Sequence, residues 1–277
     1  MSESFQIIDA FMRLPTDPFY YRILTGSSII KYLIAVTPPP GITIPDICGE
    51  CLGFQNIVCG DWNVGNLRLT DDGCFVLEST KKEHLPDVCT PWHHSKIDFL
   101  DLPDQIPGST MEGELQCRNQ LVARVVSPPS QLGDYRAAIA FWLWQPPLSE
   151  GLGPESSIYA MIEGYDIGPK FLAHITENRT RIIGFMVEGL QARIAGVSDI
   201  DKCKAVLSKL HCLGIAYGNL RRDSFLVDDS LGRAYLHDFA NSYMTTDLGV
   251  LGCELAGVED ILKQPSGASL ALYRWKL

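Results

Sequence analysis

The chain has 277 residues, which is enough for one large domain or two modest ones with a sizeable core. Hydrophobic residues make up 46% and charged residues 20%, which excludes a disordered or low-complexity protein. The 23 basic and 33 acidic side chains leave a net charge of −10, and such a surface repels nucleic-acid phosphates and anionic lipids. We therefore expect no nucleic-acid partner and no membrane partner.

The distribution of apolar residues and cysteines points to a cytoplasmic protein. The apolar stretch at residues 139–144 is far shorter than the roughly 20 residues of a membrane-spanning helix. The first residues, MSESFQIIDAFMRLP, lack the basic region of a secretory signal. Nine cysteines, an odd number, indicate mostly reduced thiols. Cys48 and Cys51 form a Cys-x-x-Cys pair, but no second such pair completes a zinc site, so we expect no metal.

Strand signals dominate the first half of the chain. Two short runs at 66–70 and 74–78 flank Asp-Asp-Gly, which predicts a β-hairpin. A further strand is expected to end at residues 121–126, before the sequence Ser-Pro-Pro. A helix is then predicted from Glu155 to about Glu163, and the apolar run at 181–188 predicts a buried strand.

The clearest helix signal covers residues 199–213. Apolar residues recur there at spacings of three and four, at Ile200, Cys203, Leu207, Leu210 and Leu213. Ser198 or Asp199 is the expected N-cap, and Gly214 follows where a helix commonly ends. Residues 225–227 and 234–239, joined by a polar turn, predict a second hairpin. This order of elements predicts an α+β architecture in two lobes.

Several motifs occur together in a characteristic order. Residues 210–227 and 236–240 resemble the catalytic loop and the metal-binding strand of the protein kinase-like fold. Four further motifs are Gly-Asp-Trp-Asn at 60–63, Trp-His followed by Ile-Asp at 92–98, Pro-x-Phe-Leu-x-His at 169–174 and Gly-Phe-x-x-Glu at 184–188. In this order they resemble a group of fungal kinase-like proteins related to aminoglycoside and choline phosphotransferases.

The resemblance implies a two-lobed α+β kinase-like fold with a short C-terminal lobe. Residues 1–187 would form an N-terminal extension and a mainly β N-lobe with one helix. Residues 188–277 would form a short C-lobe with a degenerate catalytic loop. About 37 residues follow Ala240, too few for the activation segment of a protein kinase, so the small-molecule side of the fold suits this chain better.

The same resemblance shows which charged residues are altered. Active members place a lysine on the third strand that pairs with a helix glutamate, and the matching residues here would be Arg124 and Glu155. Active members read His-Gly-Asp in the catalytic loop, where this chain has Tyr-Gly-Asn at 217–219, so a neutral amide replaces the base. Ser224 replaces the metal-binding asparagine, and Asp238 keeps the metal-binding aspartate in register.

Three altered positions argue against ordinary phosphoryl transfer, because that reaction depends on positioned charge. We hypothesise a repurposed pseudokinase-type enzyme without a cofactor, which cyclises or isomerises a small, largely apolar metabolite in fungal natural-product biosynthesis. Arg124, Tyr217 and Asn219 would be catalytic and would orient the substrate and polarise a carbonyl. Other residues expected at the ligand are Glu155, Glu188, Ser224, His237, Asp238, Trp142 and Trp144.

Other interpretations stay open. The chain could instead be a non-catalytic pseudokinase that serves as a scaffold, or a weak small-molecule phosphotransferase that works through Asp238 alone. Trp142 and Trp144 also suit core packing, and His237 also suits a buried structural role. Arg124 could face solvent from an edge strand. The sequence leaves the oligomeric state open.

Overall fold

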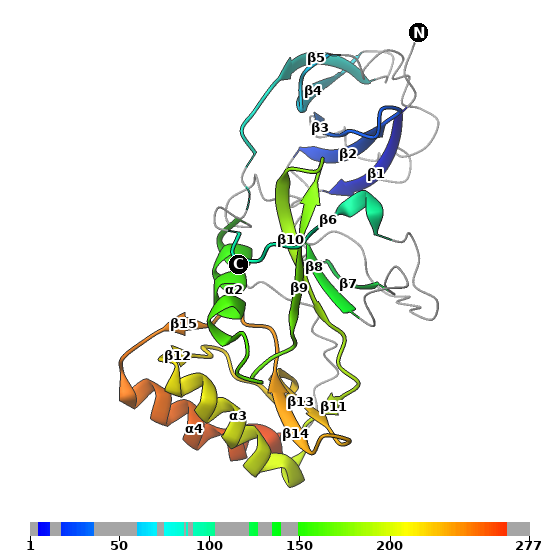
Figure 1. The fold of residues 1–277 in the computed structure, drawn as a ribbon. Coiled ribbons are helices and arrows are strands. Elements are labelled where there is room, and N and C mark those ends of the chain that lie inside the picture. The colour runs from blue at the N-terminus through cyan, green and yellow to red at the C-terminus, as the bar shows by residue number, and fades with distance from the viewer. Residues whose placement is uncertain are drawn as a thin grey trace. The chain divides into compact units, whose positions relative to one another are not determined.

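The chain forms a mixed α/β protein that is rich in β-sheet and contains few helices (Figure 1). The computed structural model describes residues 5–11, 18–35, 60–70, 75–85, 87, 91–102, 122–126, 135–139 and 149–264. The chain divides into two compact units, with the boundary directly after Leu85. The predicted boundary between residues 187 and 188 stays a prediction, and it falls at the end of a strand inside the second unit.

The first unit is built on a five-stranded sheet in the order β1-β2-β3-β4-β5. Its strands are β1 (Phe5–Phe11), β2 (Phe19–Thr25), β3 (Ile30–Ala35), β4 (Val64–Leu69) and β5 (Phe75–Lys81). Neighbouring strands are antiparallel except β3 and β4, which run parallel. The predicted hairpin is confirmed by the pairing of Leu69 with Phe75, while its turn lies outside the described residues.

The Gly-Asp-Trp-Asn motif has a structural place in the first unit. Trp62 is buried in the sheet's apolar core, beside residues such as Leu33 and Leu67. The Lys31 ammonium lies 4.1 Å from the centre of a Trp62 ring and donates to the Gly60 carbonyl at 2.8 Å. These contacts attach the motif to β3, and such a cation–π contact contributes roughly 1 kcal/mol.

The second unit begins with another five-stranded sheet, in the order β6-β9-β10-β8-β7. Its strands are β6 (Lys96–Asp98), β7 (Val122–Val126), β8 (Tyr135–Ile139), β9 (Phe171–Glu177) and β10 (Arg181–Glu188), and the short 3-10 helix η1 (Phe99–Asp101) follows β6. The predicted strand at 181–188 is confirmed residue by residue by β10. The described part of the strand expected at 121–126 is β7.

Strand β8 was not anticipated from the sequence, and it changes the place of β7. β8 pairs with β10 on one side and with β7 on the other, so β7 lies one strand further from β10. Arg124 of β7 pairs in register with Ala137 of β8. β8 is only five residues long and contains two consecutive alanines. Its sequence therefore lacks the apolar–polar alternation that would predict a strand.

Helix α2 (Ser149–Ile162) lies against this sheet (Figure 1). Glu155, Ile158, Tyr159 and Ile162 are buried at helical spacing. The Tyr159 ring contacts Phe171 of β9 and Phe185 of β10, with ring centres 6.0 and 5.3 Å apart. The predicted start at Glu155 was six residues too late, because glycines and Pro154 lower the helix propensity of the first turns.

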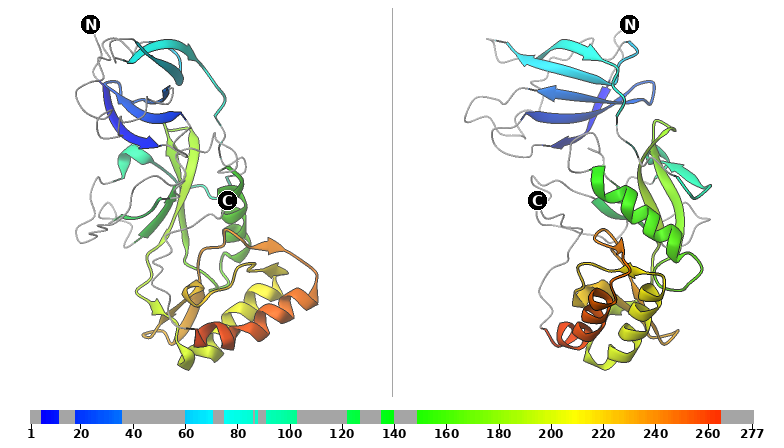
Figure 2. Two further views of the ribbon diagram at one scale, coloured as in Figure 1. Left: turned by 180° about the vertical axis from the view of Figure 1, so that it is seen from behind. Right: turned by 90° about the vertical axis from the view of Figure 1, so that its left-hand side faces the viewer.

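The remainder of the second unit contains two helices packed side by side, α3 (Ile200–Cys212) and α4 (Leu248–Lys263) (Figure 2). Its other elements are β11 (Arg193–Ile194), η2 (Val197–Asp199), β12 (Ile215–Ala216), η3 (Arg222–Ser224), β13 (Phe225–Asp228), β14 (Arg233–Leu236) and β15 (Tyr243–Met244). α3 confirms the predicted helix, with Gly214 beyond its end at a φ of +72°.

The predicted second hairpin is confirmed by β13 and β14, which pair from Phe225 with Leu236 to Asp228 with Arg233. β14 ends three residues earlier than predicted. Asp238 has a φ of +62°, in the left-handed region that no strand residue adopts. The chain therefore bends out of the sheet at the point where the metal-binding strand was expected to continue.

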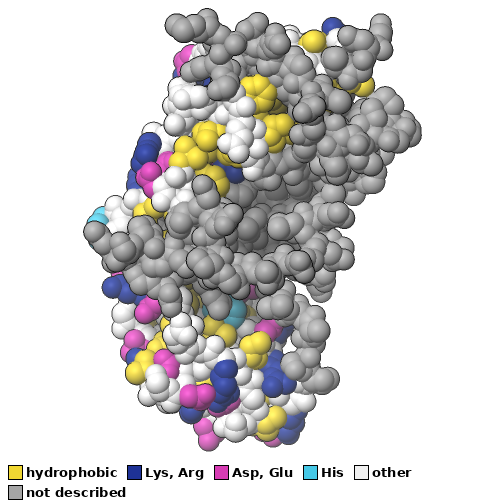
Figure 3. Space-filling model, turned by 90° about the vertical axis from the view of Figure 1, so that its right-hand side faces the viewer, with side chains coloured by type: hydrophobic (Ala, Val, Ile, Leu, Met, Phe, Trp, Pro, Cys, Tyr) yellow, Lys and Arg dark blue, Asp and Glu magenta, His cyan; other side chains and the backbone are white. Residues whose placement is uncertain are grey.

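The surface carries charges of both signs. On the face in Figure 3, Lys and Arg side chains of the described residues are interspersed with Asp and Glu side chains. No helix among the described residues is long and apolar enough to cross a membrane.

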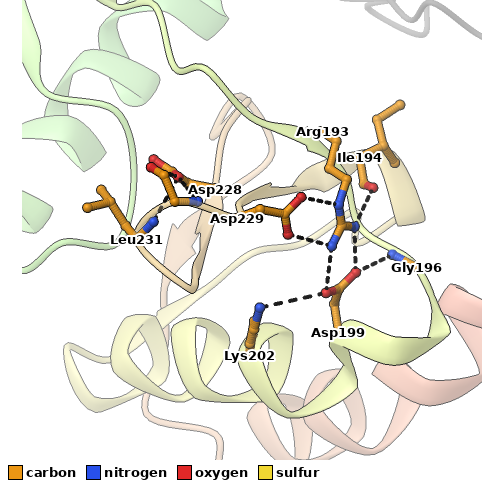
Figure 4. Close-up of polar contacts among 9 residues, drawn as sticks. Arg193, Ile194, Gly196, Asp199, Lys202, Asp228, Asp229 and Leu231 are labelled. Atoms are coloured by element: carbon orange, nitrogen blue, oxygen red, sulfur yellow. Dashed lines mark hydrogen bonds and ion pairs between the residues drawn. The ribbon is translucent and has the colours of Figure 1, made fainter.

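Arg193 links its own strand, β11, to the residue before α3 and to the turn of the second hairpin (Figure 4). Its guanidinium donates two bonds to Asp199, at 2.7 and 3.1 Å, and two to Asp229, at 2.7 and 2.8 Å. Asp199 directly precedes α3, while Asp229 follows β13 in the hairpin turn. The Asp199 carboxylate also accepts the Gly196 N–H at 2.8 Å, and the Lys202 ammonium lies 4.0 Å from its Oδ1, so loss of Arg193 would leave a buried charge with these two contacts alone.

We expect the two carboxylates bound by Arg193 to differ in their effect on stability. The Asp199 side chain is 3% exposed and that of Asp229 is 62% exposed. Asp199→Asn should lower the free energy of unfolding by about 1–3 kcal/mol, the range for a charged hydrogen-bonding partner. Asp229→Asn should have a much smaller effect, because water replaces the lost contact. Urea unfolding at pH 7 measures both, and equal losses would contradict the assignment.

Candidate functional site

The loop that follows α3 is held in place by one carboxylate. Glu254 of α4 accepts the backbone N–H of Tyr217 at 3.0 Å and that of Gly218 at 2.6 Å. Its Oε2 also lies 2.9 Å from Nε2 of His211, on α3. Glu254 therefore fixes the start of the loop to both helices. Nothing in the sequence marked this residue, because it lies 36 residues beyond Gly218 and belongs to no motif.

Gly218 is required at its position by the backbone. Its φ is +86°, and a Cβ placed there would lie 2.1 Å from the carbonyl oxygen of Asn241. The loop at 217–219 therefore approaches the backbone near β15 as closely as a glycine permits.

Tyr217 is a buried part of this loop. Its hydroxyl donates to the His237 carbonyl at 2.6 Å, and its own carbonyl accepts from the Ser242 hydroxyl at 3.1 Å. Burial and the neighbouring Asp238 raise the pKa of Tyr217 well above its usual range, so its hydroxyl keeps the proton it donates. In this arrangement Tyr217 positions the backbone directly before Asp238. Its predicted catalytic role stays a prediction.

Ser224 and His237 make further contacts within the same loop. Ser224 is buried, and its hydroxyl accepts the Arg221 N–H at 3.0 Å. Nε2 of His237 lies 2.6 Å from the Asp223 carbonyl, a distance at which the ring nitrogen donates. Both side chains stabilise the loop in this structure, and their predicted roles at a ligand stay predictions.

Asp238 is the acid around which these contacts are arranged. Its side chain is 19% exposed, and Nη2 of Arg221 lies 4.0 Å from Oδ2. Burial raises the pKa of Asp238 to about 6, although Arg221 and the N–H of Ala240 oppose the shift. The backbone at Asp238 is in the left-handed region, which costs an aspartate roughly 1 kcal/mol and is often found at functional sites.

Arg221 completes the surroundings of this acid. Its Nε also lies 3.2 Å from Oδ1 of Asp223, so one guanidinium faces two carboxylates. Arg221 lies within the motif that carried the family resemblance, but sequence reasoning assigned it no role. The sequence feature that could have marked Arg221 as a partner of an acid was its basic side chain.

Glu155 connects α2 with the segment around Asp238. Its Oε1 accepts the N–H of Phe239 at 3.1 Å, and the whole side chain is buried. Oε2 is buried as well and has no hydrogen-bond partner in the part of the chain that the structure describes. Burial and the charge of Asp238 raise the pKa of Glu155 well above its usual range, which favours its protonated form.

The structure brings some of the predicted site residues together and leaves others apart. Glu155, Tyr217, Ser224, His237 and Asp238 are connected through the contacts above. Asn219 follows Gly218 and is exposed, and Glu188 is exposed at the end of β10, where its N–H donates to Lys170 at 2.8 Å.

The remaining predicted residues cannot be assigned a place in the site. Arg124 is located by its backbone on β7, but its side chain lies outside the described part, so its pairing with Glu155 stays a prediction. Trp142 and Trp144 lie outside the described residues altogether. In the part that the structure describes, no group of three or more His, Cys, Asp or Glu residues is arranged to hold a metal ion. Cys48 and Cys51 lie outside that part.

Comparisons with known proteins add little to this geometry. No protein-family model and no curated protein matches the chain. Among solved structures, the kinase PK-1 of Cydia pomonella granulovirus is similar over 43% of this chain and 47% of its own, at 12% identity and a TM-score of 0.34. The similarity thus covers less than half of either chain. The resemblance to fungal proteins related to aminoglycoside and choline phosphotransferases stays a prediction.

The close approach at Gly218 predicts a large effect of a single methyl group. Gly218→Ala should lower the free energy of unfolding by about 3 kcal/mol or more, through the clash with Asn241 and the positive φ. Gly232→Ala is the matched control. Its φ is +66° and nothing lies within 4 Å of the added Cβ, so we expect a loss of only about 1–2 kcal/mol. Chemical denaturation distinguishes the two, and similar losses would contradict the close approach.

The raised pKa of Asp238 predicts a pH-dependent stability difference. A folded-state pKa of about 6, against about 4 when unfolded, means that the folded chain holds the proton more tightly. This contribution is present below pH 4 and is lost as the pH rises through 6. Asp238→Asn should therefore gain about 2 kcal/mol in stability relative to the natural chain between pH 4 and pH 7. Asp260→Asn, an exposed change on α4, serves as the control, and a difference that does not vary with pH would contradict the prediction.

Proposed function

We propose that the second unit is a kinase-like domain that has lost phosphoryl transfer and acts on a small, largely apolar molecule through Asp238. Its order of elements supports this proposal. Two antiparallel strands, a helix and two further strands are followed by a helix, a loop, a hairpin and the segment at 237–240. Glu155 of the first helix contacts this last segment at Phe239. A two-lobed kinase-like fold has the same order, with its ligand site between the lobes.

The proposed loss of phosphoryl transfer and the role of Asp238 rest on the contrast between Asn219 and Asp238. At the loop position where a phosphotransferase needs a base, the neutral side chain of Asn219 is exposed. Ser224, at the expected metal-binding position, is turned inward and bonded to the loop. Asp238 combines partial burial with a pKa of about 6. A carboxyl group with such a pKa exchanges protons near neutral pH, which suits acid–base chemistry.

This combination favours a reaction that moves protons within one molecule. A cyclisation or an isomerisation needs a positioned acid or base and a shaped, water-poor site, and it needs no phosphate-binding charges. Asp238 would exchange the proton, and Arg221 would stabilise its ionised form. Tyr217 and Glu155 would hold the backbone on either side of Asp238, through the His237 carbonyl and the Phe239 N–H. Natural-product biosynthesis is the setting that the sequence resemblance suggests.

A non-catalytic scaffold is the second candidate, and one observation favours it. Tyr243, Met244 and Leu248 expose 47, 57 and 81% of their surface within six positions of the chain. Exposed apolar side chains gathered in one segment are common where proteins bind each other. A scaffold would keep its function in Asp238→Asn, whereas the enzyme would lose turnover in this variant.

A thermal-shift titration with nucleotides is the first test of this proposal. We expect no rise in melting temperature with ATP or ADP, with or without magnesium or manganese. A ligand at one hundred times its dissociation constant would stabilise the folded chain by about 2.7 kcal/mol, which is easily detected.

The outcome of this titration distinguishes the candidates. A metal-dependent shift that Asp238→Asn abolishes and Asp260→Asn retains would overturn the proposal in favour of the weak phosphotransferase. Stabilisation by members of a panel of apolar small molecules, lost in Asp238→Asn, would support it.

A further inference from the structure

A segment at the start of the second unit is attached through histidine rings that accept hydrogen bonds. Nε2 of His174, on β9, accepts the backbone N–H of His93 at 3.4 Å. Nδ1 of His93 accepts the backbone N–H of Ser95 at 3.2 Å. An imidazole nitrogen accepts a hydrogen bond only while it carries no proton. Both contacts therefore require neutral rings.

The same segment contacts β9 and α2 in other ways. The N–H of His174 donates to Ser95 at 3.0 Å, and Lys96 pairs with His174 where β6 runs parallel to β9. The Trp92 indole donates to the hydroxyl of Ser156, on α2, at 3.1 Å. Protonation of the rings would remove the two hydrogen bonds that the rings accept, and the segment would then be held by the remaining contacts alone.

His174 is poorly placed to carry a charge. Its side chain is fully buried, and its ring lies against Phe171 and Trp92, with centres 5.0 and 6.3 Å away. Because Nε2 accepts, the neutral ring carries its proton on Nδ1, which has no hydrogen-bond partner in the described part of the chain. Burial, followed by the neighbouring His93 and Lys96, lowers the pKa of His174 to about 4.

The charges around His93 mostly oppose its protonation as well. Its ring is stacked on His94, with centres 4.7 Å apart. Burial and His94 lower the pKa of His93, and Lys170 lowers it further, while Glu163, just beyond α2, and the backbone of Ser95 raise it. A proton on either ring would therefore meet an unfavourable environment as well as a lost hydrogen bond.

We propose that His93 and His174 form a proton-sensitive latch, which holds residues 91–96 on β9 and α2 while both rings are neutral and releases them on acidification. The step is a proton uptake from water and breaks no covalent bond. Detached, the two imidazoles reach solvent and bind protons at their ordinary pKa near 6.5, so acid favours the released state. The stability of the latch falls as the pH drops below about 6.5 and continues to fall toward 4.

Release would reach the candidate site through one helix. Ser156, which accepts the Trp92 indole, is the neighbour of Glu155 in α2, and Glu155 bonds to the N–H of Phe239 beside Asp238. Loss of the Trp92 contact would leave α2 less constrained at the turn that carries Glu155. The latch is thus a means by which acid changes the surroundings of Asp238.

Hydrogen exchange of the full chain tests the latch. The amides of His93, Ser95 and His174 would be followed at pH 7.5 and 5.0, after correction for intrinsic exchange rates. A histidine pKa of about 4 in the closed state, against 6.5 in the open state, increases the opening constant about 25-fold over this range. Amides in the middle of α3 report global unfolding. An unchanged opening constant at the three latch amides would overturn the proposal.

Variants distinguish the latch from a general effect of acid. His174→Gln keeps an amide oxygen as acceptor but does not titrate, so the 25-fold change should largely disappear. His93→Gln tests the second ring if His174→Gln does not fold, and it should reduce the change. His94→Gln, an exposed neighbour stacked on His93, is the control and should keep most of it. Full pH dependence in both His93→Gln and His174→Gln would overturn the proposal.

Discussion

The hydrogen bond from the Phe239 N–H to Glu155 is the contact on which the candidate site depends. It joins a helix packed on the sheet to the segment that leaves the second hairpin, 84 residues later. The Tyr159 contacts with β9 and β10 hold α2 against the sheet, where Glu155 is fully buried. Asp238 is the residue directly before this bond, so its backbone is fixed from one side by Glu155 and from the other by the Tyr217 hydroxyl.

Acidic and basic groups in the second unit respond to pH in opposite directions. Burial makes the carboxyl groups of Glu155 and Asp238 hold protons more tightly than they do in the unfolded chain, so their contribution favours the folded state in acid. Burial makes His174 release its proton, so its contribution favours the folded state in neutral solution. Both contributions to stability change between pH 4 and 6.5. Acid therefore loosens the segment at 91–96 while it neutralises Asp238 and Glu155, the neighbour of Ser156 on α2.

Elements with a strong periodic pattern were predicted with good boundaries. The strand at 181–188 and the helix at 199–213 combine a continuous apolar face with clear end signals, and both are present. β8 and the first turns of α2 were missed, because alanines, glycines and Pro154 carry a weak local preference. Tyr217 and Ser224 were predicted as site residues from their positions in a motif, but their hydrogen bonds to the His237 carbonyl and the Arg221 N–H could not be inferred from it.

The sequence by itself determined the acidic, compact character of the chain, its regular strands and helices, and the neutral residue Asn219 in a kinase-like loop. The first two follow from composition and periodicity, and Asn219 is placed in that loop by a sequence resemblance to kinases alone. Only the tertiary structure decided that Glu254 holds this loop, that β8 separates β7 from β10, and that Glu155 reaches Phe239. Each of these joins residues far apart in the chain, and burial rather than local preference sets their contacts and raises the pKa of Asp238.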